Sequence, residues 1–241
     1  MEKIKRQNLL LEILRSSPRR INKIFIQKER YQKKISEIIH QAKAKKIPCV
    51  QVPKQRLDRL ALDHQGVVAF LSPKEFSSLD DIMNEAEVPF LLLLDGVEDP
   101  QNLGAIIRSA EGAGVDGIIL PERRSVGLTE AVSKVSAGAL ENMKIARVKN
   151  LGSTLDALKK QGVWLVGAEA GQKESWYEFD YSLPVGLVLG SEGQGLRPLV
   201  KKKCDKILSI PLFGKLNSLN VAAAASVFIF EVVRQRKEGK K

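Results

Sequence analysis

Apolar and polar residues follow two different patterns along this chain, a mixed one up to about residue 73 and a regular one from residue 90 onward. In the first part, apolar residues spaced three or four apart predict helices over 2–15, 31–46 and 54–62. Short alternating or continuous apolar runs predict strands over 20–27, 48–52 and 66–71. Helices and strands that alternate within about 70 residues predict a small three-layer α/β domain.

From residue 90 onward the pattern is that of a larger α/β domain. Strands are expected over 90–95, 116–120, 144–148, 163–168, 185–190 and 206–210, and helices over 103–113, 129–139, 153–161, 196–201 and 221–236. Strands that alternate with helices predict a parallel sheet with helices on both faces, in which ligands bind beyond the carboxyl ends of the strands. The stretch between the two patterns is polar and acidic. We therefore expect domains at 1–73 and 89–241, with 74–88 as a linker.

The positive charge of the chain is concentrated in its first part. Residues 1–73 hold 17 Lys and Arg but 6 Asp and Glu, whereas residues 74–241 hold 22 of each kind. A basic domain joined to a neutral one suggests that the first part binds a polyanion such as RNA and that the second performs chemistry. The alternative is a solvated lysine-rich surface with no partner. A membrane surface fits less well, because the sequence has no basic amphipathic helix with aromatic residues.

Several other classes find little support in the sequence. No apolar run approaches the roughly 20 residues that span a bilayer, and the N-terminal segment lacks the pattern of a secretory signal. Cys49 and Cys204 form no CxxC pattern, and His40 and His64 have no cysteine cluster near them in sequence, which argues against a zinc site. We therefore expect a reduced, cytoplasmic protein that binds no metal and no membrane.

Three strand-to-helix junctions carry the candidate chemistry. The first contains Asn102, Gly104, Arg108 and Glu111. A structural explanation is available for each residue. Asn102 could cap a helix, Gly104 could allow close packing, and Arg108 could pair with Glu111 three positions later. Arg108 could instead reach across the strand ends, where a planar guanidinium suits phosphate and ribose groups.

The other two junctions combine glycines with short polar side chains. The second reads GSEGQG from Gly190 to Gly195 and contains Glu192. The third begins at Ile210-Pro211 and continues through Ser218, Leu219 and Asn220 into an alanine-rich helix. Asn220 is a strong candidate for a helix cap, and Glu192 alone would be an ordinary loop carboxylate. The glycine spacing does not match the GxGxxG fingerprint of dinucleotide-binding domains.

Taken in this order, NLGAIIR, GSEGQG and IP with SLNVAAA resemble the motifs of the SpoU (TrmH-like) ribose 2′-O-methyltransferases, which belong to the SPOUT class. The N-terminal part, notably DHQGVVAF at 63–70, is similar to the L30e-like domain of many such enzymes. The resemblance implies a C-terminal domain with a deep trefoil knot, S-adenosylmethionine as cofactor, and a homodimer whose active sites use both subunits. The catalytic residues that it implies are Asn102, Arg108, Glu192, Ser218 and Asn220. The cofactor-binding residues that it implies are Gly167, Gly190, Ile210, Ser218 and Leu219.

Within the family, the resemblance favours the enzymes that methylate a guanosine of 23S rRNA. The same chemistry on tRNA or on another rRNA loop, and a non-catalytic RNA-binding protein that keeps the fold, remain alternatives. The family mechanism makes Arg108 a general base, although a guanidinium has a pKa above about 12. Two roles are therefore open for Arg108: a base in a special environment, or a cation that stabilises the developing alkoxide.

Overall fold

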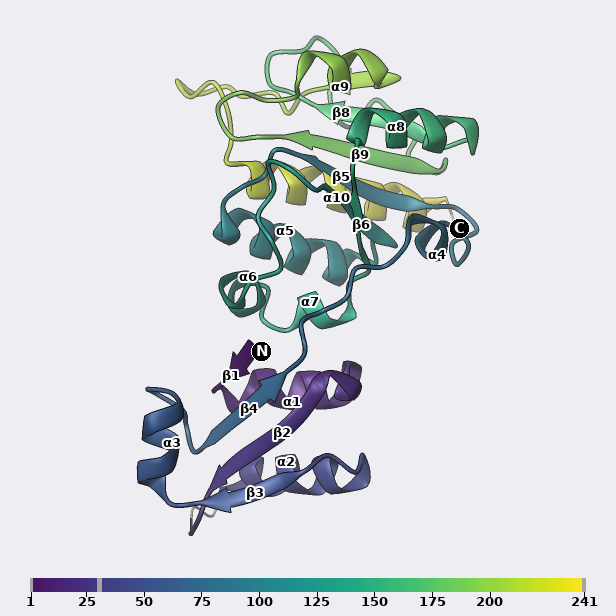
Figure 1. Cartoon of the computed structure of the whole chain (residues 1–241). Helices are drawn as coiled ribbons and strands as arrows, with labels where there is room; N and C mark the ends of the chain where they lie inside the picture. The colour runs from purple at the N-terminus through teal and green to yellow at the C-terminus, as the bar shows by residue number, and fades with distance from the viewer. Residues whose placement is uncertain (1, 30–31, 240–241) are drawn as a thin grey trace. The chain divides into compact units, whose positions relative to one another are not determined.

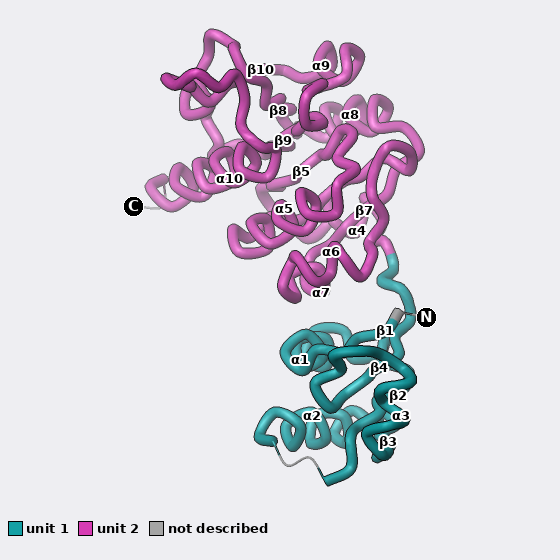
Figure 2. Tube along the Cα trace, turned by 90° about the vertical axis from the view of Figure 1, so that its left-hand side faces the viewer, with its two compact units in different colours: residues 1–75 teal, residues 76–241 magenta. Residues whose placement is uncertain are grey.

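The chain divides at Glu75 into two units, each with its own hydrophobic core. The computed structural model describes residues 2–29 and 32–239, and the units are Met1–Glu75 and Phe76–Lys241 (Figure 2). Apolar side chains from strands and helices of the same unit form each core. Each unit is therefore described separately.

The first unit is a four-stranded sheet with helices on both faces. Its strands are β1 (Glu2–Ile4), β2 (Ile21–Gln27), β3 (Cys49–Val52) and β4 (Val67–Leu71), in the order β1-β4-β2-β3. Only the β2–β3 pair is parallel. Helices α1 (Gln7–Ser16) and α2 (Lys33–Ala44) share a core with one face of the sheet, and α3 (Lys54–Leu60) packs on the other. A short 3₁₀ helix, Pro18–Arg20, precedes β2. The three layers predicted from the sequence are present.

The start of the chain differs from the helix predicted over 2–15. Glu2–Ile4 forms a strand that pairs with β4, and the helix begins at Gln7. Ile4 fits a helical spacing, but pairing with β4 buries its side chain in the core as well, so the spacing could not separate the two structures. The first residue of the helix predicted over 31–46 lies outside the described residues, and α2 covers the rest of it closely.

The second unit is built on a six-stranded sheet, and every strand pair in it is parallel. Its strands are β5 (Phe90–Asp95), β6 (Gly117–Pro121), β7 (Ile145–Val148), β8 (Trp164–Ala168), β9 (Val185–Gly190) and β10 (Lys206–Leu208). They are arranged in the order β10-β8-β9-β5-β6-β7. The central strands are buried along their whole length, which explains their continuous apolar sequences.

Helices cover both faces of this sheet, as the alternation of elements predicted (Figure 1). One face packs against α5 (Pro100–Ala113), α6 (Glu130–Val135), α7 (Ala139–Asn142) and α10 (Val221–Glu238). The other face packs against α4 (Leu79–Met83), α8 (Leu151–Lys160) and α9 (Pro198–Lys203). Of these, α5 and α10 frame the candidate site, because both begin at the carboxyl edge of the sheet.

Two helical segments differ from what the sequence predicted. The helix predicted over 129–139 is split into α6 and α7, because Ala137 and Gly138 adopt left-handed backbone angles, with φ of 53° and 98°. Residues 74–88, expected as a linker, contain α4, which Ser78 caps with its side chain. Ile82 of α4 lies so close over Gly117 of β6 that a Cβ at Gly117 would be 2.5 Å from a methyl group of Ile82.

Candidate functional site

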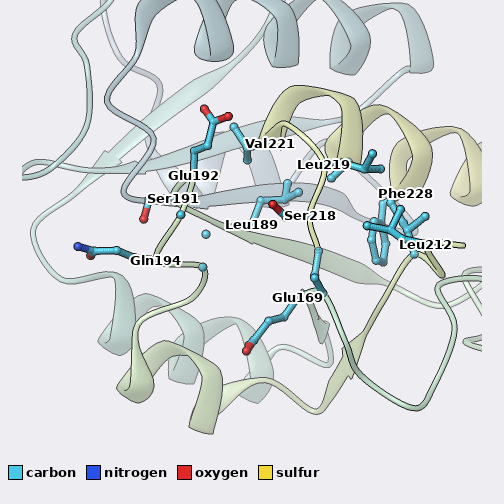
Figure 3. A pocket seen from close by; sticks show the side chains of 17 residues that line it. Glu169, Leu189, Ser191, Glu192, Gln194, Leu212, Ser218, Leu219, Val221 and Phe228 are labelled. Carbon is cyan, nitrogen blue, oxygen red and sulfur yellow. The ribbon is translucent and has the colours of Figure 1, made fainter. Parts of the chain in front are cut away.

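A cavity of about 270 Å³ lies where strands β8 and β9 of the second unit end (Figure 3). Its walls are the end of β8 with the two residues that follow it (168–170), the loop at 189–195, and the segment at 210–228, which includes the first turns of α10. Apolar side chains from all three parts, including Leu189, Leu212 and Phe228, line it beside Glu169 and Glu192. A cavity with apolar walls and a few polar groups is typical of a small-molecule site.

The loop after β9 folds back tightly on the end of its own strand. Ser191 and Gly195 exchange backbone hydrogen bonds of 3.1 and 3.0 Å, and Gly193 and Gly195 have φ of 87° and 67°. A Cβ on Gly190 would overlap the backbone of Gly195 and the nitrogen of Leu196. The glycines of GSEGQG are therefore required by this turn, which places the side chain of Glu192 at the cavity wall.

Three predicted residues from the three motifs meet in one hydrogen-bonded cluster. Asn102 Nδ2 donates to Glu192 Oε2 over 3.1 Å, and Asn220 Nδ2 donates to Asn102 Oδ1 over 2.8 Å and to Glu192 Oε1 over 3.5 Å. These residues are separated by 90 and 118 positions in sequence. The two amides thus hold the carboxylate of Glu192 in a fixed orientation.

Asn220 also caps α10, so the capping role and the contacts within the cluster are compatible in one side chain. Its Oδ1 accepts from the backbone N–H groups of Ala222 and Ala223, at 3.0 and 3.3 Å. Asn102, in contrast, does not cap α5, because Asp99 has that role and accepts from the N–H of Gln101. With the first turn of α5 capped by Asp99, the side chain of Asn102 is free to enter the cluster.

A second cavity, of about 320 Å³, lies on the other side of this cluster. Its lining includes Asn102, Arg124 and the loop at 95–99, and it shares Ser191, Glu192, Gln194 and Val221 with the first cavity. Glu192 therefore stands in the wall between two neighbouring cavities. Such a pair of cavities can hold a donor molecule and an acceptor molecule side by side.

The sequence did not predict the ion pair of Asp95 and Arg197, which lies beside the wall between the two cavities. Asp95, at the end of β5, is buried, with an exposed fraction of 1%. Its carboxylate accepts from the backbone N–H and from Nε of Arg197, at 3.0 and 2.6 Å, and forms an ion pair with the same guanidinium. Two charged residues 102 positions apart carry no local signal, so only the fold brings them together.

Glu169, at the rim of the first cavity, is a second residue that the sequence reading missed. One of its carboxylate oxygens, Oε1, accepts from Lys201 Nζ over 2.8 Å. The other oxygen, Oε2, is buried and has no hydrogen-bond partner among the described residues. A buried oxygen of this kind is costly unless a ligand donates to it. It is therefore a candidate contact for a hydroxyl or ammonium group.

Arg108 does not join the cluster. It lies on an exposed part of α5, lines neither cavity, and has no hydrogen bond or ion pair among the described residues. The pairing with Glu111 that the sequence allowed is absent from that part of the chain, and Glu111 accepts instead from Asn142 Nδ2 over 3.1 Å. The isolated chain thus presents a free guanidinium on the surface of the helix that carries Asn102.

The predicted cofactor residues divide into two groups. Gly190, Ile210, Ser218 and Leu219 line the first cavity. Gly167 does not line this cavity, because it precedes Ala168, which is the lining residue at the end of β8. A Cβ there would be 2.6 Å from Ile207 Cδ1 and 2.8 Å from Leu196 Cδ1. Gly167 is therefore a packing position of β8, and the neighbouring Ala168 forms the wall.

Metal ligands, membrane spans and reactive cysteines complete the description of the described residues. Within residues 2–29 and 32–239, no group of three or more His, Cys, Asp and Glu is placed to hold a metal ion. No helix in the same ranges is long and apolar enough to cross a membrane. Burial raises the pKa of the Cys204 thiol to about 12, so this cysteine is not a thiolate nucleophile near neutral pH.

Two family models cover most of the chain. Residues 89–230 match the SpoU rRNA Methylase family, and residues 7–77 match a model described as RNA 2′-O ribose methyltransferase substrate binding. The chain belongs to the SpoU family. The motifs that meet at the cavity wall lie within the first match, and the basic first unit coincides with the second. The fold is accordingly the SPOUT fold preceded by a small α/β domain.

Sequence relatives and solved structures agree with this membership. A protein of Staphylococcus saprophyticus assigned to the TrmH family of tRNA/rRNA methyltransferases is 45% identical over 90% of this chain and 89% of its own length. The Bacillus subtilis protein YacO, with the same assignment, is 41% identical over 95% and 94%. The SpoU methyltransferase AviRb of Streptomyces viridochromogenes, solved in complex with the cofactor AdoMet, has a TM-score of 0.84 and 25% identity over 98% of this chain and 91% of its own.

Proposed function

We propose that this protein transfers a methyl group from S-adenosylmethionine to a ribose 2′-hydroxyl of structured RNA, with a guanosine of 23S rRNA as the target. The observation that carries the proposal is the cluster of Asn102, Glu192 and Asn220, in which the two amides hold Glu192 at the wall between two cavities. Methyl transfer requires a donor and an acceptor held in line, and this wall separates a site for each.

The first cavity suits the cofactor. Leu189, Leu212 and Phe228 offer apolar surface for an adenine ring, while the unpartnered Oε2 of Glu169 can accept from a hydroxyl or ammonium group. Glu169 and Glu192 add negative charge to a site for a cation. When bound there, S-adenosylmethionine supplies an electrophilic methyl group on a sulfonium.

The cluster at the wall would position the acceptor. Glu192, fixed by the amides of Asn102 and Asn220, can accept a hydrogen bond from a ribose hydroxyl in the second cavity. This bond would orient the hydroxyl oxygen toward the first cavity, and such alignment supplies several kcal/mol of the rate enhancement. Ser218 lines the first cavity and can donate to a group bound there.

Arg108 fits this mechanism if a second subunit supplies it. The guanidinium is exposed and lies outside the cluster of its own chain. Helix α10 presents Phe230, which is 51% exposed, with Val227 and Val233 partly buried, so an apolar strip is available for a partner. Phe228 of the same helix is buried and lines the first cavity. We infer a two-fold homodimer in which Arg108 of the partner subunit stabilises the developing alkoxide. The 2′-oxygen takes the methyl group, S-adenosylhomocysteine is the leaving group, and the hydroxyl proton is released late, to water.

Mapping of the methylated nucleotide tests the proposed function. Unmodified 23S rRNA and a tRNA pool, each incubated with the protein and radiolabelled S-adenosylmethionine, should show label in the 23S rRNA, on the 2′-oxygen of one guanosine. Label confined to tRNA would reject the proposed target but keep the chemistry. Calorimetric binding of S-adenosylmethionine with no label in either RNA would reject the catalytic proposal in favour of a binding protein that keeps the fold.

A further inference from the structure

The sheet of the first unit has one face that α3 covers only in part. Helix α3 packs its Leu57 against Phe25, Val52 and Val68 in a small core on this face. The rest of the face is formed by Phe70 of β4, which is partly buried, and by exposed lysines on both neighbouring strands. Phe70 pairs across the sheet with Lys3 of β1 on one side and with Lys23 of β2 on the other.

Lys23 points to this face together with Phe25. Residues two apart on a regular strand point to the same side, and Lys23 and Phe25 pair in regular register with Phe70 and Val68 of β4. The pairing shifts between Ile21 and Lys23, and this bulge lets Ile21 lie buried on the α1–α2 side with Ile24. The bulge therefore keeps Ile21 in the core while Lys23 lies on the face that carries Phe70.

Three cations lie over the two aromatic rings of this face. Lys3 Nζ is 5.7 Å from the centroid of the Phe70 ring, and Lys23 Nζ and Arg56 Cζ are 5.1 and 5.8 Å from that of Phe25. The two rings meet edge to face, with centroids 5.8 Å apart. We call these five residues the cation–aromatic face.

The positive charge of this face is not neutralised within the described part of the chain. No carboxylate there pairs with Lys3, Lys23 or Arg56, and all three residues are exposed. Lys3 Nζ has one further contact, with the carbonyl oxygen of Leu60 at the end of α3, over 3.4 Å. The nearby Asp58 of α3 is bonded to His64. Two cations over one ring repel each other, and a bound anion would relieve that repulsion.

We propose that the cation–aromatic face binds the phosphate backbone of the RNA substrate. The choice of RNA as the ligand rests on the proposed function. The position of the binding surface rests only on the contacts of these five residues. Residues 1–73 hold 17 of the 39 Lys and Arg of the chain, and a polyanion is the ligand that such a surplus suits. The rings hold the three cations in place beforehand, which lowers the conformational entropy that phosphate binding removes. Phe25 and Phe70 thus act as supports for the cations.

The test compares two full-length variants that each lose three charges. The first carries Lys3→Gln, Lys23→Gln and Arg56→Gln. The control carries Lys43→Gln, Lys45→Gln and Lys46→Gln, which are exposed and lie at the end of α2. Binding to an unmodified 23S rRNA transcript is measured by filter retention between about 50 and 200 mM salt. Circular dichroism and S-adenosylmethionine calorimetry confirm that both variants are folded.

The first variant should bind RNA at least about tenfold more weakly at the lower salt, and its log–log salt slope should fall by about 2 to 3, as expected for three lost phosphate contacts. The control should change the slope by less than about 1. Equal losses in both variants would overturn the proposal, since they would indicate a diffuse basic surface. A first variant with the RNA affinity and the salt slope of the wild-type protein would overturn the proposal as well.

A charge-neutral substitution tests the supporting rings. Phe70→Leu keeps all three cations and most of the apolar volume, and should weaken RNA binding two- to fivefold with the salt slope retained. An unchanged affinity would remove the rings from the proposal. These measurements do not depend on methyl transfer. If the protein bound RNA through this face but methylated nothing, the proposed function would fail while this inference stood.

Discussion

The side-chain amide of Asn220 joins two helices at the carboxyl edge of the sheet. Its Nδ2 donates to Oδ1 of Asn102 on α5 over 2.8 Å, while its own Oδ1 caps α10. The capping bonds determine which end of the amide faces Asn102, so the donor is always directed at the cluster. One residue therefore fixes both the start of α10 and the orientation of Glu192.

Replacement of Asn220 can separate these two roles. Asn220→Asp keeps an oxygen that caps α10 but removes the donor to Asn102 and Glu192, whereas Asn220→Ala removes both. We expect both variants to lose at least about 99% of methyl transfer, a loss of about 3 kcal/mol in transition-state stabilisation. Only the Ala variant should also lose about 1 kcal/mol of stability as a lost cap. Urea denaturation and a radiolabel assay measure the two effects. An active Asp variant would show that Asn220 is a cap and nothing more.

Arg108 should be needed for methyl transfer and dispensable for the fold. Its exposed position predicts that Arg108→Ala changes stability by less than about 0.5 kcal/mol and leaves S-adenosylmethionine binding intact, while activity falls more than tenfold. Arg108→Lys should fail too, because an ammonium lacks the planar fork of donors. A variant that retained more than about a tenth of the wild-type rate would contradict the role assigned to Arg108.

Mixed subunits show whether Arg108 acts across the interface. Arg108→Ala and Asn220→Ala homodimers, each inactive, are unfolded together and refolded as a mixture. If the guanidinium acts across the two-fold axis, each heterodimer has one intact site, and the mixture recovers about a quarter of wild-type activity. If it acts within its own chain, no intact site forms and no activity returns. Light scattering checks that the mixture is dimeric, and a monomeric active protein would reject the interface altogether.

The sequence predicted the strands of the second unit well, because buried parallel strands are continuous apolar runs. It also predicted that Asn102, Glu192 and Asn220 belong to one site, since all three follow strand ends. It could not reveal the Asp95–Arg197 pair or the free oxygen of Glu169. Both depend on contacts between segments that are far apart in sequence, and each residue alone resembles an ordinary surface charge.

Local backbone geometry accounts for the remaining differences. The helix predicted over 129–139 has a regular apolar spacing, but left-handed angles at Ala137 and Gly138 interrupt it. Close packing contributes as well. A Cβ at Gly104 would lie 2.6 Å from Val135 Cβ, so α5 and α6 touch at this glycine, as the structural explanation of Gly104 predicted. The bulge at Asn22, which lets Ile21 and Ile24 lie in the same core, is likewise not evident from the sequence of β2.

Glu169 should contribute to cofactor affinity through its unpartnered oxygen. We expect Glu169→Gln to weaken S-adenosylmethionine binding about ten- to a hundredfold, as the loss of one charged hydrogen bond would. Lys201→Met is the matched control, because it breaks the Glu169–Lys201 ion pair and leaves the carboxylate in place. Calorimetry of both variants separates the two effects. A larger loss in the Lys201 variant would mean that the ion pair, and not the free oxygen, matters.

Gly190 should tolerate no side chain. A Cβ there would overlap the backbone of Gly195, so Gly190→Ala must open the turn that carries Glu192. We expect lost cofactor binding together with a destabilisation of at least about 2 kcal/mol. Gly127→Ala is the control, since no heavy atom lies within 4 Å of its added Cβ. Thermal unfolding with and without S-adenosylmethionine measures both properties, and equal behaviour of the two variants would contradict the packing argument.

The division of labour between the two units predicts the behaviour of a fragment. Residues 76–241 include α4, whose Ile82 completes the core of the second unit, so this fragment should fold and bind S-adenosylmethionine with nearly full affinity. A fragment that began at residue 89 would lack that helix and should be less stable.

The same fragment, 76–241, should bind RNA weakly and with a shallow dependence on salt, because the excess of basic residues lies in residues 1–73. The full chain should instead lose RNA affinity steeply as the salt concentration rises. Filter binding of both proteins to the same 23S rRNA transcript makes the comparison. Equal affinity of the fragment and the full chain would show that the second unit alone holds the RNA.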